Sequence, residues 1–108
     1  MPITDADLAR IKAEHPDHEL HLLSNAEMGV EVVVKAPGHA EWKVFRTSQS
    51  DDLKKPTALR DLLLCCIVEP PAQAFMAVLG HRPGLAETFG AELLEIGGLS
   101  RDTIRRKL

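Results

Sequence analysis

Residues 62–85, LLLCCIVEPPAQAFMAVLGHRPGL, are the least ordinary stretch of the chain and decide how its second half folds. Apolar side chains recur here at intervals of three and four, which is the spacing of one face of an α-helix. The first stripe consists of Leu59, Leu62, Leu63, Cys66 and Ile67. Pro70 and Pro71 end this helix, and Pro71 can begin the next, because proline fits the first turn of a helix but not its interior. The stretch predicts two short helices whose apolar faces meet without a long loop.

Helical periodicity continues through the rest of this half. The members of the next two stripes are Ala72, Phe75, Met76 and Leu79, and then Leu85, Phe89, Leu93 and Ile96. Gly80 ends the first of these helices and the pair Gly97–Gly98 ends the second, because glycine is the favoured residue just after a helix. Ser100 then caps a last short turn, RDTIRRKL. We expect an array of short helices from residue 51 onward.

In the first half of the chain, the spacing of apolar residues changes from helical to alternating. TDADLARIKAEHP predicts a helix capped by Thr4, and GVEVVVKA alternates like a half-buried strand after an extended HELHLLS. PGHA predicts a turn in which Gly38 can take a positive φ, and EWKVFRTS, residues 41–48, predicts a third strand. The expected fold is α+β: a short N-terminal helix, a small antiparallel β-meander, then a C-terminal array of short α-helices. Residues 1–108 form a single domain, with the helix and meander in 1–50 and the helical part in 51–108.

Charge and hydropathy narrow the class of protein. The 108 residues carry a formal net charge of −3, with five Lys/Arg against eight Asp/Glu in residues 1–50 and eight of each in residues 51–108. Nucleic-acid binding needs a concentrated basic face, so none is expected, and the basic tail can simply complement a helix dipole. No apolar run approaches the roughly 20 residues that cross a bilayer, so no membrane partner is expected either. The acidic start lacks the pattern of a signal peptide, which together with only two cysteines favours the cytoplasm.

Two side-chain groups suggest chemistry but have simpler explanations. Cys65 and Cys66 are adjacent, so on a helix they point about 100° apart, and their apolar neighbours predict that they pack as small core hydrophobes rather than reactive thiols. Three histidines lie close together in the sequence: His15, which ends the predicted helix, and His18 and His21, which would lie on the following strand. Residues an odd number of positions apart point to opposite faces of a strand, so we expect exposed histidines and no metal site.

No pattern of catalytic residues accompanies these groups. Glu69, His81 and Arg82 lie beside prolines, yet no nucleophile or partner base stands at a recognisable spacing from them. GGLS follows a helix and lacks the lysine of a phosphate-binding loop. The sequence predicts a protein that is not an enzyme and has no cofactor.

The segment ALRDLLLCCIVEPPAQAFMAVLGHRPGLAETFGAELLEIGGLS resembles the helical core of small phage tail assembly chaperones. The shared pattern is an apolar helix with cysteine at LLCCIVEP, a proline, a short helix, RPGL, and a helix that closes at the glycine pair of EIGG. The resemblance covers about residues 42–100. It implies a non-enzymatic helper in the host cytoplasm that binds the tape-measure protein and recruits tail-tube subunits, often beside a longer product made by translational frameshifting.

Such a role needs apolar side chains that a client can cover. The side chains predicted to contact a partner are Phe75, Met76, Leu79, Phe89 and Leu93. Ordinary core packing is the alternative for each of them, and it is the commoner role of such residues. Two other functions stay open, a structural or tail-completion component retained in the virion and a small regulatory protein-binding domain. The surplus of apolar residues also leaves self-association open.

Overall fold

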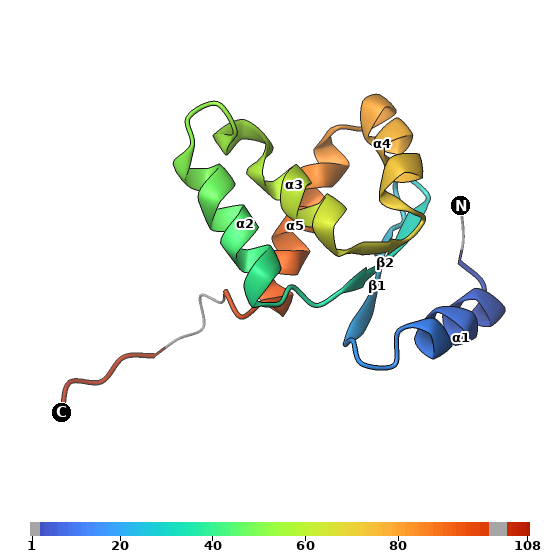
Figure 1. Ribbon diagram of the computed structural model, residues 1–108, viewed down its shortest axis with the longest axis horizontal. Coiled ribbons are helices and arrows are strands. Elements are labelled where there is room, and N and C mark those ends of the chain that lie inside the picture. Colours follow the sequence, from blue (N-terminus) through green and yellow to red (C-terminus); the bar gives the residue numbers. More distant parts are fainter. Residues whose placement is uncertain (1–2, 100–103) are drawn as a thin grey trace.

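The computed structural model describes residues 3–99 and 104–108, and it confirms the α+β class (Figure 1). In chain order the elements are α1 (Asp5–Glu14), β1 (Leu20–Asn25), β2 (Val30–Lys35), α2 (His39–Ser50), the 3₁₀ helix η1 (Lys55–Thr57), α3 (Ala58–Cys66), β3 (Ile67–Glu69), α4 (Ala72–His81) and α5 (Gly84–Ile96). The predicted last turn begins at Ser100, which lies outside the described residues, and residues 104–108 are neither helical nor extended in a sheet.

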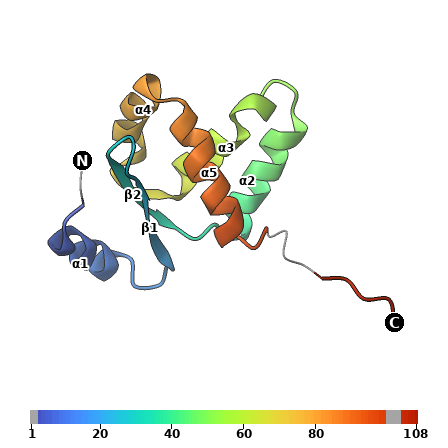
Figure 2. The same cartoon turned by 180° about the vertical axis from the view of Figure 1, so that it is seen from behind.

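The sheet lies between α1 on one face and the helical array on the other (Figures 1 and 2). Val32 and Val34 belong to the main core, whereas Val33 points to the opposite face, where it lines a small depression with Leu8 and Ile11 of α1. Val33 is nevertheless only 2% exposed. The prediction of a half-buried strand was therefore wrong, because α1 covers the second face.

The hairpin between β1 and β2 has a regular antiparallel register in which Leu22 faces Val33. Asn25 accepts a hydrogen bond from the Met28 N–H through Oδ1 at 3.1 Å, and Gly29 has φ +63°. A side chain rarely adopts that left-handed backbone, so the turn requires glycine at this position. The local sequence thus sets the register of the two strands.

The predicted third strand at residues 41–48 is wrong, because this segment forms α2. Its buried positions are Phe45 and Ser48, three apart, and Trp42 contacts Phe45 with ring centroids 5.7 Å apart. Val44, which the alternating pattern placed with Trp42, is 43% exposed. Gly38 also differs from prediction: it is the N-cap of α2 with φ −88°.

The third strand is instead β3, which pairs antiparallel with β2 through Val33–Glu69 and Val34–Ile67. Strand order is β1-β2-β3, but two α-helices intervene before β3, so the sheet is not a meander of consecutive hairpins. The predicted helix up to Pro70 ends at Cys66, and Ile67 leaves the helical stripe to enter the sheet. The sheet consequently draws on both halves of the chain.

Helix α3 packs between α2 and α5 and forms the centre of the core. Its Leu62, Leu63 and Cys66 are fully buried, and Asp61 accepts a hydrogen bond from the buried Ser48 hydroxyl of α2 at 3.5 Å. The helix ends follow the sequence closely. Thr4 caps α1, α4 ends at His81, one residue beyond Gly80, and α5 ends at Ile96, just before Gly97.

Candidate protein-docking groove

Four of the five predicted partner-binding side chains are buried. Phe75, Phe89 and Leu93 are at most 1% exposed and Leu79 is 7% exposed, and the rings of Phe75 and Phe89 lie 6.3 Å apart between centroids. The structure brings these residues together as core rather than as a surface. Met76 differs, because it lies on the outer side of α4 and is 54% exposed.

The two thiols occupy different environments. Cys66 is buried in the core, and burial raises the pKa of its thiol to about 12. Cys65 is exposed, which corrects the prediction that both cysteines pack as core hydrophobes. Partial burial, followed by the charge of Asp61, still raises the pKa of Cys65. A raised pKa lowers the thiolate fraction at neutral pH, so neither environment activates its thiol as a nucleophile.

The histidines take part in local side-chain contacts. The rings of His15 and His18 lie 6.0 Å apart, and His21 Nε2 lies 2.9 Å from Glu19 Oε2. Within residues 3–99 and 104–108, no group of three His, Cys, Asp or Glu side chains is arranged to hold a metal ion.

The same part of the chain contains no helix long and apolar enough to span a bilayer.

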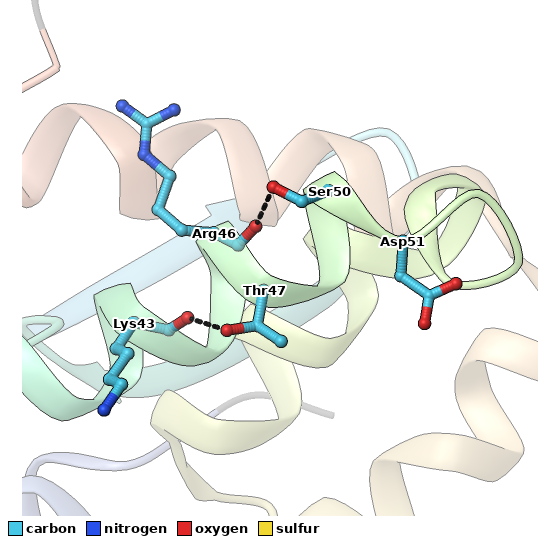
Figure 3. Close-up of a pocket in the computed structure, with 5 residues that line it drawn as sticks. All are labelled: Lys43, Arg46, Thr47, Ser50 and Asp51. Atoms are coloured by element: carbon cyan, nitrogen blue, oxygen red, sulfur yellow. Dashed lines mark hydrogen bonds between the residues drawn. The ribbon is translucent and has the colours of Figure 1, made fainter.

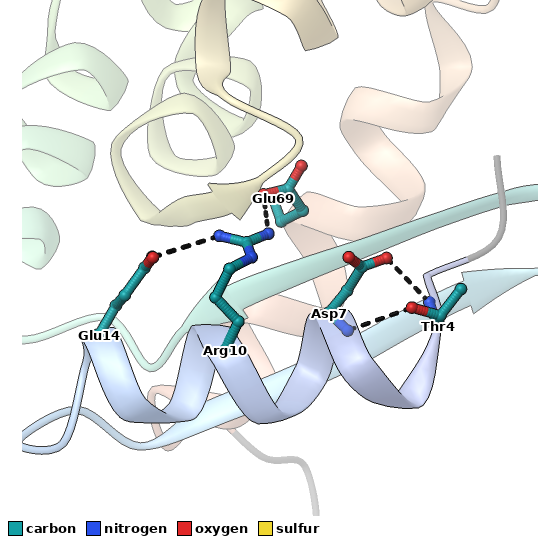
Figure 4. Close-up of polar contacts among 5 residues, drawn as sticks. All are labelled: Thr4, Asp7, Arg10, Glu14 and Glu69. Atoms are coloured by element: carbon teal, nitrogen blue, oxygen red, sulfur yellow. Dashed lines mark hydrogen bonds and ion pairs between the residues drawn. The ribbon is translucent and has the colours of Figure 1, made fainter.

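Glu69 of β3 forms an ion pair with Arg10 of α1 (Figure 4). Arg10 Nη2 lies 3.4 Å from Glu69 Oε2, and Arg10 Nη1 lies 3.3 Å from Glu14 Oε2. The Arg10 side chain, which both pairs share, is about half exposed. Exposed ion pairs of this kind contribute little stability each, so this network positions α1 on the sheet without anchoring it strongly.

A shallow depression on the open face of α2 is lined by Lys43, Arg46, Thr47, Ser50 and Asp51 (Figure 3). Thr47 donates its hydroxyl to the Lys43 carbonyl at 2.9 Å, and Ser50 donates to the Arg46 carbonyl at 3.0 Å. The two basic side chains point away from each other in Figure 3. Because the hydroxyls serve their own helix and the cations diverge, this face does not form a convergent site.

A groove of about 560 Å³ lies where α2, η1, the start of α3 and α5 meet. Its apolar lining is made by Phe45, Pro56, Ala58, Leu59, Pro83, Ala86 and Leu94, and its polar lining by Gln49, Lys55, Thr57, Arg60 and Glu87. The volume falls within the range of about 300–1,000 Å³ that is typical of small-molecule sites, so the groove has room for a few side chains. An apolar floor with charges of both signs around it is the usual arrangement of a protein-docking surface.

Local sequence explains how the groove is shaped. Pro56 lies at the start of η1, and Pro83 is the N-cap of α5. Since proline cannot continue a helix, each marks a change of direction where a new helix begins, and both prolines line the groove. Sequence reasoning missed these residues because they come from four elements. The prolines of the helix-starting segments KPT and RPGL mark the change of direction but do not show which residues come together.

The comparisons with known proteins bear on the fold alone. No protein-family model and no curated protein matches the chain. A solved structure, described as that of the uncharacterised protein rbstp2171 from Bacillus stearothermophilus, is similar with a TM-score of 0.77 and 17% sequence identity. The match covers 92% of this chain and 99% of that one. Almost the whole chain therefore shares a fold with that protein, and a shared fold does not carry a function with it.

Proposed function

We propose that this chain is a non-enzymatic tail assembly chaperone, a protein that masks an apolar segment of the phage tape-measure protein in the groove formed by α2, η1, α3 and α5. The observation that carries the proposal is the groove itself, a cleft with a partly exposed apolar lining assembled from four packed elements. The identity of the client is supported by the resemblance of residues 42–100 to that family. Recruitment of tail-tube subunits and action in the host cytoplasm belong to the same proposal.

The lining of the groove suits one helix of a client. An amphipathic helix presents apolar side chains every three or four residues, and a groove with an apolar floor can accept two or three of them. Leu59 and Leu94 are half-buried, so each keeps apolar surface that a client side chain can cover. Burial of such surface stabilises a complex by about 25 cal/mol per Å² before the entropic cost of association.

The rim of the groove gives the client an orientation. Lys55 and Arg60 lie on one part of the lining and Glu87 lies on α5. All three side chains are exposed. Charges at a rim mainly affect the rate and specificity of association rather than its strength. A client helix with acidic residues near Lys55 and Arg60 fits this arrangement.

Co-expression with the tape-measure protein tests the proposal. The wild-type chain is expected to raise the soluble fraction of the client, and Leu94→Gln is expected to lower that gain severalfold. The double variant Lys55→Glu/Arg60→Glu is expected to lower it less, because rim charges mainly affect the rate and specificity of association. Met28→Gln is the matched control, because Met28 is 47% exposed in the β1–β2 turn, outside the groove. Thermal unfolding of each variant shows whether it still folds. A client that is equally insoluble with and without the wild-type chain overturns the proposal.

A further inference from the structure

Residues 104–108 differ strongly in charge from residues 1–99. Residues 1–99 hold nine Lys/Arg against 15 Asp/Glu, a formal charge of −6, whereas residues 104–108 are Ile-Arg-Arg-Lys-Leu with a charge of +3. The two apolar side chains of this segment, Ile104 and Leu108, are 93% and 103% exposed. Residues 104–108 therefore present both positive charge and apolar surface, and neither is covered within the monomer.

A second cleft, of about 310 Å³, has the complementary character. Its apolar lining is made by Ile3, Val30, Pro70, Phe75 and Val78. The charged members of its lining are all acidic, namely Asp7, Glu31 and Glu69. Each of the three is only partly exposed, so its charge lies at the cleft wall and not at the end of a freely extended side chain.

Most of the hydrogen bonds to these carboxylates come from neutral donors. Glu31 accepts from the Ile3 N–H at 2.8 Å and the Ser24 hydroxyl at 3.0 Å, and Asp7 accepts from the Thr4 N–H at 3.1 Å. All of these donors are neutral. A cation, Arg10, lies beside them; it pairs with Glu69 and Glu14 (Figure 4), and its charge also acts on Asp7. The hydrogen bond from Ile3 lowers the pKa of Glu31, and that from Thr4 lowers the pKa of Asp7, so both stay ionised at neutral pH.

We infer that residues 104–108 bind in this acidic apolar cleft of a second copy of the chain. The cationic side chains would face Asp7, Glu31 and Glu69, and Ile104 or Leu108 would cover the apolar floor. The segment extends from the end of the long axis that carries α2 and α5, whereas the cleft lies between α1, the sheet and α4 at the other end (Figures 1 and 2). Because the segment lies away from the cleft of its own chain, the proposed occupant comes from a second copy.

This contact joins two different surfaces, residues 104–108 of one copy and the acidic apolar cleft of the next. Such an arrangement repeats along a row of molecules unless the rotation between neighbours closes a ring. A five-residue segment covers far less area than a stable dimer interface, so the contact is weak and depends on concentration. It is also salt-dependent, because its charges are near the surface. The inference is independent of the proposed function, since it needs no client.

Sedimentation velocity of the purified full chain at low salt tests the inference. The wild type is expected to grow in mass with concentration and to return to monomer in 0.5 M salt. Arg105→Glu/Arg106→Glu/Lys107→Glu is expected to weaken the association about tenfold or more, as the loss of three surface charge pairs implies. This variant changes exposed residues only, so its folding is not at risk.

A charge exchange identifies the cleft. In Glu31→Lys/Glu69→Lys, both residues 104–108 and the cleft are basic, so this variant is expected to remain monomeric alone. It is expected to associate with Arg105→Glu/Arg106→Glu/Lys107→Glu, the acidic-tail variant, when the two are mixed. Circular dichroism checks its fold, and the milder Glu31→Gln/Glu69→Gln replaces it if it unfolds, with weakened self-association as the expected result. The inference is overturned if the wild type is monomeric at every concentration, if the acidic-tail variant associates as well as the wild type, or if folded cleft variants associate normally.

Discussion

Gly90 of α5 lies directly against Leu59 of α3. A Cβ atom on Gly90 would come within 2.9 Å of the Leu59 Cβ and 3.2 Å of the Leu59 carbonyl oxygen. The absence of a side chain at position 90 therefore allows the two helix backbones to approach closely. Since Leu59 and Leu94 both line the groove, this close contact also sets how wide the groove opens.

Replacing Gly90 should separate the two helices. Gly90→Ala is expected to lower the free energy of unfolding by about 1–2 kcal/mol, because overpacking costs roughly 1–3 kcal/mol while the gain in helix propensity returns at most about 1 kcal/mol. Gly80→Ala is the matched control, since a Cβ at this position in α4 meets nothing within 4 Å. It should be neutral or stabilise by up to about 1 kcal/mol. Urea unfolding followed by the fluorescence of Trp42 measures both, and equal effects of the two substitutions would contradict the close contact.

The ion pair between Lys35 and Glu41 should give a pH-dependent contribution to stability. Lys35 Nζ lies 3.0 Å from Glu41 Oε1, and the side chains are only 28% and 16% exposed. The hydrogen bond from Lys35 lowers the pKa of Glu41 below 4.5. A carboxyl whose pKa is lowered by folding stabilises the protein above its unfolded value and loses that effect as the pH falls through the folded value.

Glu41→Gln is accordingly expected to cost about 0.5–1 kcal/mol at pH 7, and the cost should shrink as the pH falls below 4.5. Urea unfolding at several pH values measures this difference. Lys35→Met and the double variant complete a thermodynamic cycle that isolates the pair from other effects of each substitution. A cost that is the same at pH 7 and pH 3 would show that the ion pair is not its cause.

The two cysteines should differ sharply in their reaction with an aromatic disulfide reagent. We expect one thiol, Cys65, to react in the folded protein and Cys66 to react only on unfolding, because Cys66 is buried and its pKa is raised to about 12. Cys65 should react more slowly than a free cysteine at pH 8, since its pKa is also raised. Cys65→Ser should remove the native-state reaction and Cys66→Ser should keep it. Two thiols reacting at similar rates in the folded protein would be incompatible with this structure.

The elements that the sequence predicted well are those whose signals are local. Thr4 and Asp7 form a reciprocal capping box at the start of α1, and the apolar stripes of α4 and α5 predicted their helices. Helix α2 was missed because one of its two buried residues is Ser48, which is polar, so its helical face does not appear as an apolar stripe. Its alternating Trp42 and Val44 resembled a strand instead. Glu41 in its first turn was the remaining signal of a helix start.

Strand β3 was missed for a different reason. Its three residues continue the apolar run of α3, and nothing within Ile67–Glu69 distinguishes a last helical turn from a short strand that pairs with β2. The burial of the predicted partner-binding residues was missed for a similar reason. Phe75 and Leu93 have the helical spacing of an apolar face, but spacing does not show which face the rest of the fold covers. The groove depends on contacts between four elements, so only the folded chain reveals it.

Site-specific photo-crosslinking tests the central claim, that the groove holds the client, most directly. A photoreactive amino acid is placed at position 60, in the groove, or at position 28, in the β1–β2 turn, and each protein is co-expressed with the tape-measure protein and irradiated. A cross-link to the client is expected from position 60 and none from position 28. A chain that keeps the client soluble while position 60 forms no cross-link would contradict this claim.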